Sequence, residues 1–119
     1  NPEVRERILH GLFAGRAIDK VLEAARVEKD PRIRRTAISL LGASRQPEAA
    51  EALVTMFGSE QDKDVRREIL HAMFAQKNAK SLIDMARKER DPELKREAVR
   101  LLSSMKSKEA SDYLMELLK

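Results

Sequence analysis

The sequence predicts an all-α fold, a right-handed α-α superhelix (solenoid) of four helix pairs. Three observations predict it. Shifted by 61 positions without a gap, the 119-residue chain matches itself at 19 of 58 aligned positions, which indicates an internal duplication. Apolar residues recur at the three- and four-residue spacing of helices, and no segment alternates as a strand would. A single helix pair cannot bury its apolar face alone, whereas stacked pairs can.

Each half of the duplication divides again, which predicts a single domain of four repeats and eight helices. The expected repeats are 1–29, 30–61, 62–90 and 91–119, and they begin NPEVRER, DPRIRRT, DKDVRRE and DPELKRE. An Asn or Asp accepts hydrogen bonds from the first free helix amides and is a favoured N-cap. Pro suits the first helical position because its missing N–H is not needed there, and Lys63 is the one departure.

Apolar stripes at helical spacing follow each start, and they predict which face of each helix is buried. For the four first helices the stripes are Val4, Ile8, Leu12; Ile33, Ala37, Leu41; Val65, Ile69, Met73; and Leu94, Ala98, Leu102. For the four second helices they are Ile18, Val21, Leu22, Ala25; Ala50, Leu53, Val54, Phe57; Ala79, Leu82, Ile83, Ala86; and Ser111, Leu114, Met115, Leu118.

The segment DPRIRRTAISLLGASRQPEAAEALVTMF, residues 30–57, carries the pattern D-P-x-V-R-x-x-A-x-x-x-L-G, then a polar turn and E-A-x-x-x-L. This pattern resembles the short HEAT-like repeats of phycobilin lyases and bacterial HEAT scaffold proteins, and the resemblance extends over the whole chain. It implies an interaction scaffold whose second helices line the concave face. It also implies a ladder of ion pairs between repeats, formed by Arg5, Arg34, Arg66 and Lys95 with Glu28, Glu60 and Glu89.

The second helices carry the predicted protein-binding surface, an apolar strip flanked by acidic residues. Such a surface suits a basic amphipathic segment of a partner protein. The predicted contact residues are Glu51, Met56, Asp84, Met85, Asp112, Tyr113, Glu116 and Leu117. The alternative is that Met56 and Met85 only seal adjacent repeats.

A basic column offers a second interaction surface, with one cation in the turn inside each helix pair. Its members are Arg16, Arg45, Lys77 and Lys106. A regular row of cations can follow a phosphate backbone or an acidic partner. The alternative is that these cations favour helix dipoles and solubility. With three Phe, one Tyr and no Trp, the chain offers little on which nucleic-acid bases could stack, which argues against nucleic acid as the partner.

The sequence predicts no catalytic residue, no metal site and no cofactor. Cys is absent, which removes thiolate ligands and nucleophiles. His10 and His71 occupy equivalent positions, where we expect them to be exposed and without partners. Two repeats separate them by about 20 Å, too far to share a metal ion. Activity as part of a HEAT-like lyase is an alternative that depends on the resemblance alone.

Charged residues make up 37% of the chain and apolar residues 42%, and the net charge is +4. No apolar run approaches the roughly 20 residues needed to span a bilayer, and no signal-peptide pattern is present. The compartment is left open. Because the chain begins at Asn1, we expect it to be a segment of a longer array. A bare apolar end face is costly, so we expect a neighbouring repeat or end-to-end association at the ends.

Overall fold

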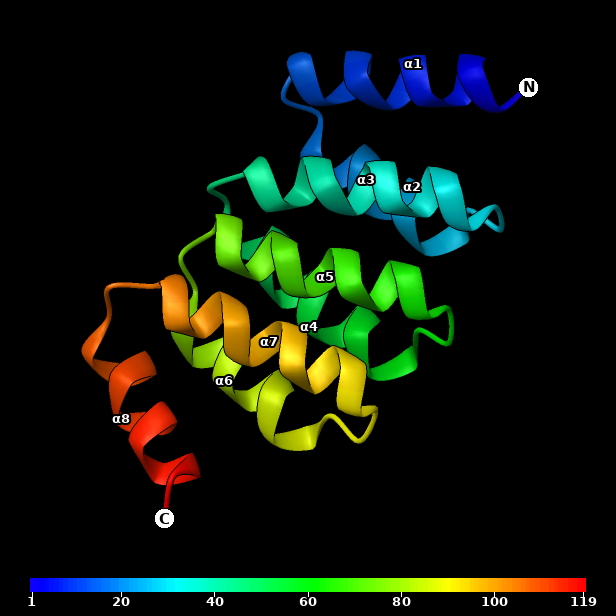
Figure 1. Cartoon of the computed structure of the whole chain (residues 1–119). Helices are drawn as coiled ribbons and strands as arrows, with labels where there is room; N and C mark the ends of the chain where they lie inside the picture. The colour runs from blue at the N-terminus through cyan, green and yellow to red at the C-terminus, as the bar shows by residue number, and fades with distance from the viewer.

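The computed structural model describes all residues from Asn1 to Lys119, and they form a stack of eight helices without strands (Figure 1). The helices are α1 (Pro2–Ala14), α2 (Ile18–Val27), α3 (Pro31–Ala43), α4 (Pro47–Ser59), α5 (Lys63–Ala75), α6 (Ala79–Lys88), α7 (Pro92–Ser104) and α8 (Lys108–Leu117). The first helices α1, α3, α5 and α7 form the front layer of Figure 1, and α2, α4 and α6 lie behind them. The chain runs leftward through α1, returns behind through α2 and comes forward again at α3, which is a right-handed path. The predicted solenoid of helix pairs is confirmed.

The predicted N-caps hold the start of every first helix. Each cap side chain accepts a hydrogen bond from the backbone N–H two residues ahead, which satisfies one of the free amides of the first turn. The donor–acceptor distance is 2.9 Å for Asn1, Asp30 and Asp62 and 2.8 Å for Asp91. Helix α5 begins normally although Lys63 replaces Pro, because Asp62 supplies the cap.

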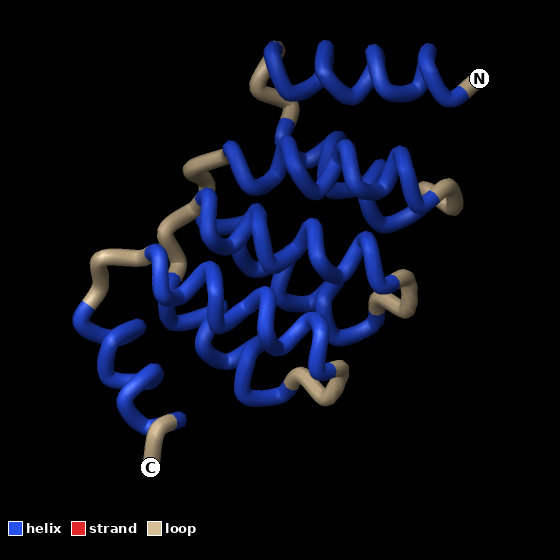
Figure 2. Tube along the Cα trace, viewed as in Figure 1, coloured by secondary structure: helices blue, strands red, loops and turns tan.

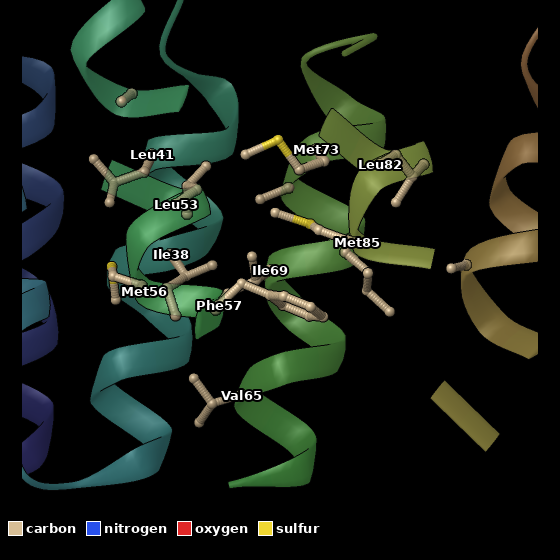
Figure 3. Close-up of a cluster of buried hydrophobic side chains, with 14 of the residues drawn as sticks. Ile38, Leu41, Leu53, Met56, Phe57, Val65, Ile69, Met73, Leu82 and Met85 are labelled. Atoms are coloured by element: carbon tan, nitrogen blue, oxygen red, sulfur yellow. The ribbon is translucent and has the colours of Figure 1, made fainter. Parts of the chain in front are cut away.

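The apolar stripes of α3, α5 and α7 form the centre of the core. All nine of their predicted residues are at most 1% exposed, as are Val21, Leu53 and Leu82 of the second helices. Figure 3 shows side chains from α3, α4, α5 and α6 packed into one cluster. Since the buried residues form a single continuous cluster through all eight helices, each helix pair is stabilised by its neighbours.

The stripe predicted for α1 is wrong in part, because Val4 is 53% exposed and Ile8 is 54% exposed. The equivalent residues of α5, Val65 and Ile69, are fully buried. In the later pairs this side of the first helix packs against the preceding pair, and no helix covers the same side of α1. Helix α1 therefore contributes only Leu9 to the fully buried core.

The stripe predicted for α8 is also wrong in part, because Met115 is 58% exposed and Leu118 is 80% exposed, whereas Leu114 packs against the core. Ala110 and Tyr113 are buried instead. The ring of Tyr113 lies under the guanidinium of Arg87, whose Cζ is 4.8 Å from the ring centroid. Helix α8 is tilted relative to the rest of the stack (Figure 1), so a different face meets α6 and α7.

The junction between the second and third helix pairs is wedge-shaped. Helices α3 and α5 make the closest contact in the stack, where Gly42 faces Ala72 with no room for a side chain. The backbones of α4 and α6 stay apart, and the bulky Phe57 and Met85 side chains are buried in this region (Figure 3), whereas Met56 lies on the side of α4 that faces α2. At this junction the first helices therefore pack more closely than the second helices.

The predicted ladder of ion pairs is confirmed for the three Arg–Glu pairs. The N–O distances are 3.0 Å for Arg5–Glu28, 2.9 Å for Arg34–Glu60 and 2.7 Å for Arg66–Glu89. The Glu of each pair also accepts the backbone N–H of the Asp that caps the next first helix, at 3.0 Å. The ladder therefore links the turn between two pairs to the first helices on both sides. Lys95 forms no such pair.

None of the eight helices combines the length and the apolar character that crossing a bilayer requires.

Candidate interaction surfaces

The apolar strip expected on the second helices is not exposed. Met56 is 8% exposed, Met85 is 4% exposed and Tyr113 is 3% exposed, and all three belong to the hydrophobic core. These side chains point inward because the splayed second helices leave space that only large residues fill. This corrects the prediction that they provide contact area for a partner. The alternative, in which Met56 and Met85 seal adjacent repeats, is the one that the packing supports.

The acidic residues and Leu117 do lie on the second-helix surface. Glu51 on α4 and Asp84 on α6 are exposed and form no ion pair. Asp112 accepts a hydrogen bond from Lys108 within α8, at 2.9 Å. Glu116 forms an ion pair with Arg87 of α6, and the lowered pKa of Glu116 follows chiefly from that hydrogen bond. Leu117 is 45% exposed beside Glu116.

The four basic column residues lie on one edge of the molecule, in the turns inside the helix pairs. Figure 2 shows these turns along the left side, opposite the turns that join successive pairs. All four side chains are exposed, and none takes part in an ion pair. The structure therefore places Arg16, Arg45, Lys77 and Lys106 where a partner could reach them.

Two shallow hollows lie between successive turns of this edge, and sequence analysis did not find them. The first, of about 400 Å³, lies between the α3–α4 and α5–α6 turns, and Arg45 and Lys77 line it. The second, of about 530 Å³, lies between the α5–α6 and α7–α8 turns, and Lys77 and Lys106 line it. Gln76 is held in the wall of the first hollow because its amide donates to the carbonyls of Leu41 and Ser44.

The comparison with protein families decides the identity of the repeats. A sequence model of HEAT repeats matches residues 1–73, more than half of the chain. The chain belongs to the HEAT-repeat family. HEAT repeats generally act as scaffolds for protein interactions. A comparison with curated proteins gives no match, and neither does a comparison with solved structures.

The two histidines of these HEAT repeats have different surroundings. His10 is exposed, as expected, whereas His71 is partly covered and its Nε2 lies 2.6 Å from Oε2 of Glu97. The expectation that both histidines lack partners is therefore wrong for His71. The sequence offered no signal for this pair, because Thr36 stands at the equivalent of Glu97 in the first half of the duplication. The pair is thus absent from the repeating pattern.

The Glu97 carboxylate is held mainly by an arginine. Arg100 donates to both of its oxygens, at 3.1 and 2.6 Å. The pKa of Glu97 is lowered, first by the Arg100 hydrogen bond and then by His71. Such a carboxylate is a weak proton acceptor, so the cluster is suited to joining α5 to α7 rather than to moving protons. No group of three His, Asp or Glu side chains lies close enough to share a metal ion.

Proposed function

We propose that this HEAT-repeat chain is a non-catalytic scaffold that binds a basic segment of a partner protein on its second-helix face. The observation that carries the proposal is that Glu51 on α4 and Asp84 on α6 are exposed and form no ion pair. Arg87 lies near Asp84, but its guanidinium pairs with Glu116. Asp112 and Glu116 extend the acidic row onto α8. Complementary charge across such a face selects the partner and steers its approach.

The burial of the methionines changes the kind of binding that this face supports. The large apolar side chains that the second helices expose are Val27, which is 69% exposed, Val54 and Leu117, which are each 45% exposed, and Met115, which is 58% exposed. Without an apolar channel, the face lacks the desolvated anchor that dominates tight interfaces. We therefore expect binding that depends on charge and weakens as salt is added.

The experiment compares the proteins that three versions of the chain capture from the source lysate: the wild type, E51K/D84K and the control E3K/D64K. The control changes net charge equally, but on the first helices, where both side chains are exposed. Mass spectrometry identifies the captured proteins, and thermal unfolding verifies that all three versions fold. We expect a partner retained by the wild type and the control, and reduced about tenfold by E51K/D84K. A set of captured proteins that is the same for all three versions would contradict the proposal.

The captured partner is then cross-linked to the wild-type chain to locate the contact. Cross-links to Lys80 or Lys88 of α6, which are exposed beside the acidic row, are expected. Cross-links confined to the first helices would show that the scaffold binds through another face.

A further inference from the structure

The two edges of the stack carry opposite charge patterns. The turns that join successive pairs read EKD, EQD and ERD, at 28–30, 60–62 and 89–91. The turns inside the pairs read GRA, SRQ, QKN and MKS, at 15–17, 44–46, 76–78 and 105–107. Each turn of the second kind contains one cation and no acidic residue. We call this edge, defined by Arg16, Arg45, Lys77 and Lys106, the basic edge.

The opposite edge is satisfied within the molecule. Its glutamates pair with arginines of the first helices, and its aspartates cap the first helices. The cations of the basic edge have no comparable role, because they are exposed and bind no group of the chain. The charged groups of the acidic edge are therefore used within the fold, whereas the cations of the basic edge contribute only the favourable charge of a cation at the end of a helix.

The backbone of the basic edge adds an independent observation. Arg16 has a φ of 63° and Lys77 a φ of 57°, and they are the only residues of the chain with positive φ. Each ends a first helix in a Schellman motif: the N–H of Lys77 donates to Phe74, and the next N–H donates to Met73. Gly, or sometimes Asn, is usual at this position because a β-carbon is unfavourable there.

Both halves of the duplication thus place a long cationic side chain where the backbone favours Gly. Because Gly would close the same helix end at lower cost, the backbone does not explain the long cationic side chain, which points to a function for that side chain. The hollows give that function a location, since Lys77 stands between them with Arg45 on one side and Lys106 on the other. No acidic residue lines either hollow.

We propose that the basic edge is a second docking surface, which binds an extended acidic segment of a partner protein. Neighbouring packed helices lie about 8–10 Å apart. One three-residue turn of an extended polyproline II chain spans about 9 Å and returns its side chains to the same side. A segment in this conformation with Asp or Glu at every third position therefore presents one carboxylate to each successive turn. The two hollows accept the side chains on either side of Lys77.

A nucleic acid fits this edge less well than an acidic segment does. Single-stranded nucleic acids are held by aromatic side chains on which bases stack. The only aromatic residue lining either hollow is the partly buried Phe74, and no exposed aromatic lies in the four turns. The carboxylates of an acidic peptide need no stacking surface, and they can bind to the cations that this edge exposes.

The experiment measures binding of fluorescent peptides to the whole chain by fluorescence anisotropy. The first peptide has about 12 residues, enough to pass all four turns, with Glu at every third position and Pro and Ser between, so that it favours the polyproline II conformation. The second has the same composition with its Glu residues adjacent. An oligothymidylate of similar length is the nucleic-acid probe. We expect the spaced peptide to bind about tenfold more tightly than the clustered peptide and the oligothymidylate.

Three variants locate the binding. K77E tests the central cation, and K29E is its matched control, because Lys29 is an exposed cation on the opposite edge and changes net charge equally. K77N tests the backbone, since Asn tolerates positive φ and removes only the charge. We expect K77E and K77N each to weaken the spaced peptide about tenfold, K29E to have little effect, and K77N to unfold no more easily than wild type.

Two results would overturn the proposal. One is an equal loss of peptide binding in K77E and K29E, which would show that only net charge matters. The other is tighter binding of the oligothymidylate than of the spaced peptide, which would assign the edge to nucleic acid. Because Glu51 and Asp84 lie on another face, the variant E51K/D84K should not weaken the spaced peptide. The two proposals can therefore fail separately.

Discussion

A β-carbon on Gly42 would lie 2.8 Å from both the Cα and the Cβ of Ala72, which is closer than carbon atoms approach in folded proteins. Helices α3 and α5 can therefore meet at this point only because one of the two residues is Gly. The obstructing atoms belong to the backbone and the β-carbon of Ala72, so no flexible side chain can move aside. The close contact on the first-helix side and the large side chains on the second-helix side together set the shape of the central junction.

The substitution G42A should lower the free energy of unfolding by about 1–3 kcal/mol, because the two helices must separate to admit the methyl group. This loss exceeds the gain of about 1 kcal/mol that Ala brings to a helix interior. Urea denaturation of both proteins measures the difference.

The control is G58A in α4, where an added β-carbon meets no atom within 4 Å. It should raise the free energy of unfolding by about 0.5–1 kcal/mol through helix propensity alone. Equal stability changes for the two substitutions would show that α3 and α5 are not held by this contact.

The ladder pair Arg34–Glu60 should contribute more to stability than the ion pairs on the surface. The Arg34 side chain is 17% exposed and the Glu60 side chain is 9% exposed. Glu60 also accepts the backbone N–H of Asp62. Replacing Glu60 by Ala leaves both donors without their partner, and we expect a loss of about 2–4 kcal/mol.

A double-mutant cycle separates the pair energy from other effects of truncation. For Arg34→Ala and Glu60→Ala we expect a coupling of about 1–3 kcal/mol that changes little with salt. For the exposed pair Lys108 and Asp112 we expect at most about 0.5 kcal/mol, lost at high salt. Similar coupling energies in the two cycles would mean that the Arg34–Glu60 pair contributes no more to stability than an exposed ion pair does.

Tyr113 has a buried hydroxyl without a hydrogen-bond partner. Burial also raises the pKa of this hydroxyl. Y113F removes an unsatisfied polar group and keeps the ring beneath Arg87, so we expect stability to be unchanged or about 1 kcal/mol higher. Y113A should instead cost about 3–5 kcal/mol, because the ring fills the interface of α8. Thermal and urea unfolding measure both, and a clear loss in Y113F would reveal a partner for the hydroxyl.

Stability should fall in acid because several carboxylates have lowered pKa values in the folded state. Arg100 lowers the pKa of Glu97 first, with His71 second, and Lys63 lowers that of Glu93. A carboxylate with a lowered folded pKa stabilises the fold above its unfolded pKa, about 4.3 for Glu. That contribution is lost as the pH falls through the folded pKa. Urea midpoints should therefore be level near neutral pH and decrease below about pH 5.

Glu97→Gln tests one of these groups directly. Its urea midpoint should lie below that of the wild type near neutral pH and converge with it in acid, because protonation removes the same charge. Glu51→Gln is the control, since Glu51 is exposed and unpaired. If Glu97→Gln and Glu51→Gln give parallel pH profiles, the Glu97 cluster does not contribute to acid sensitivity.

Much of the fold could be predicted because its signals are local. The capping Asp residues and the Pro residues mark where the first helices begin, and the duplication repeats those marks. The ladder could be predicted as well, because its arginines and glutamates recur at equivalent positions of the repeats. The exposure of the four turn cations also follows from their position in short polar turns.

The predicted binding strip failed for a reason that the composition of α4 explains. This helix is apolar over a wide arc, with Ala50, Val54 and Met56 on different sides of Leu53. Helical spacing could not decide whether Val54 or Met56 faces the core, and the structure buries Met56 and leaves Val54 exposed. The prediction that His71 has no partner failed for another reason. The His71–Glu97 pair occurs only once, so a comparison of the repeats gives no sign of it.

By itself, the sequence determined that the chain is a stack of four helix pairs, where each first helix begins, and which acids and arginines join the pairs. Spacing and capping act over one or two helical turns, so they can be read from the chain directly. The tertiary structure alone decided how α4 and α8 are rotated, which side of the central junction is narrow, and that Arg16 and Lys77 adopt positive φ. These features depend on the volumes of side chains that meet from different helices, as Gly42 and Ala72 do, and no single stretch of sequence contains both partners.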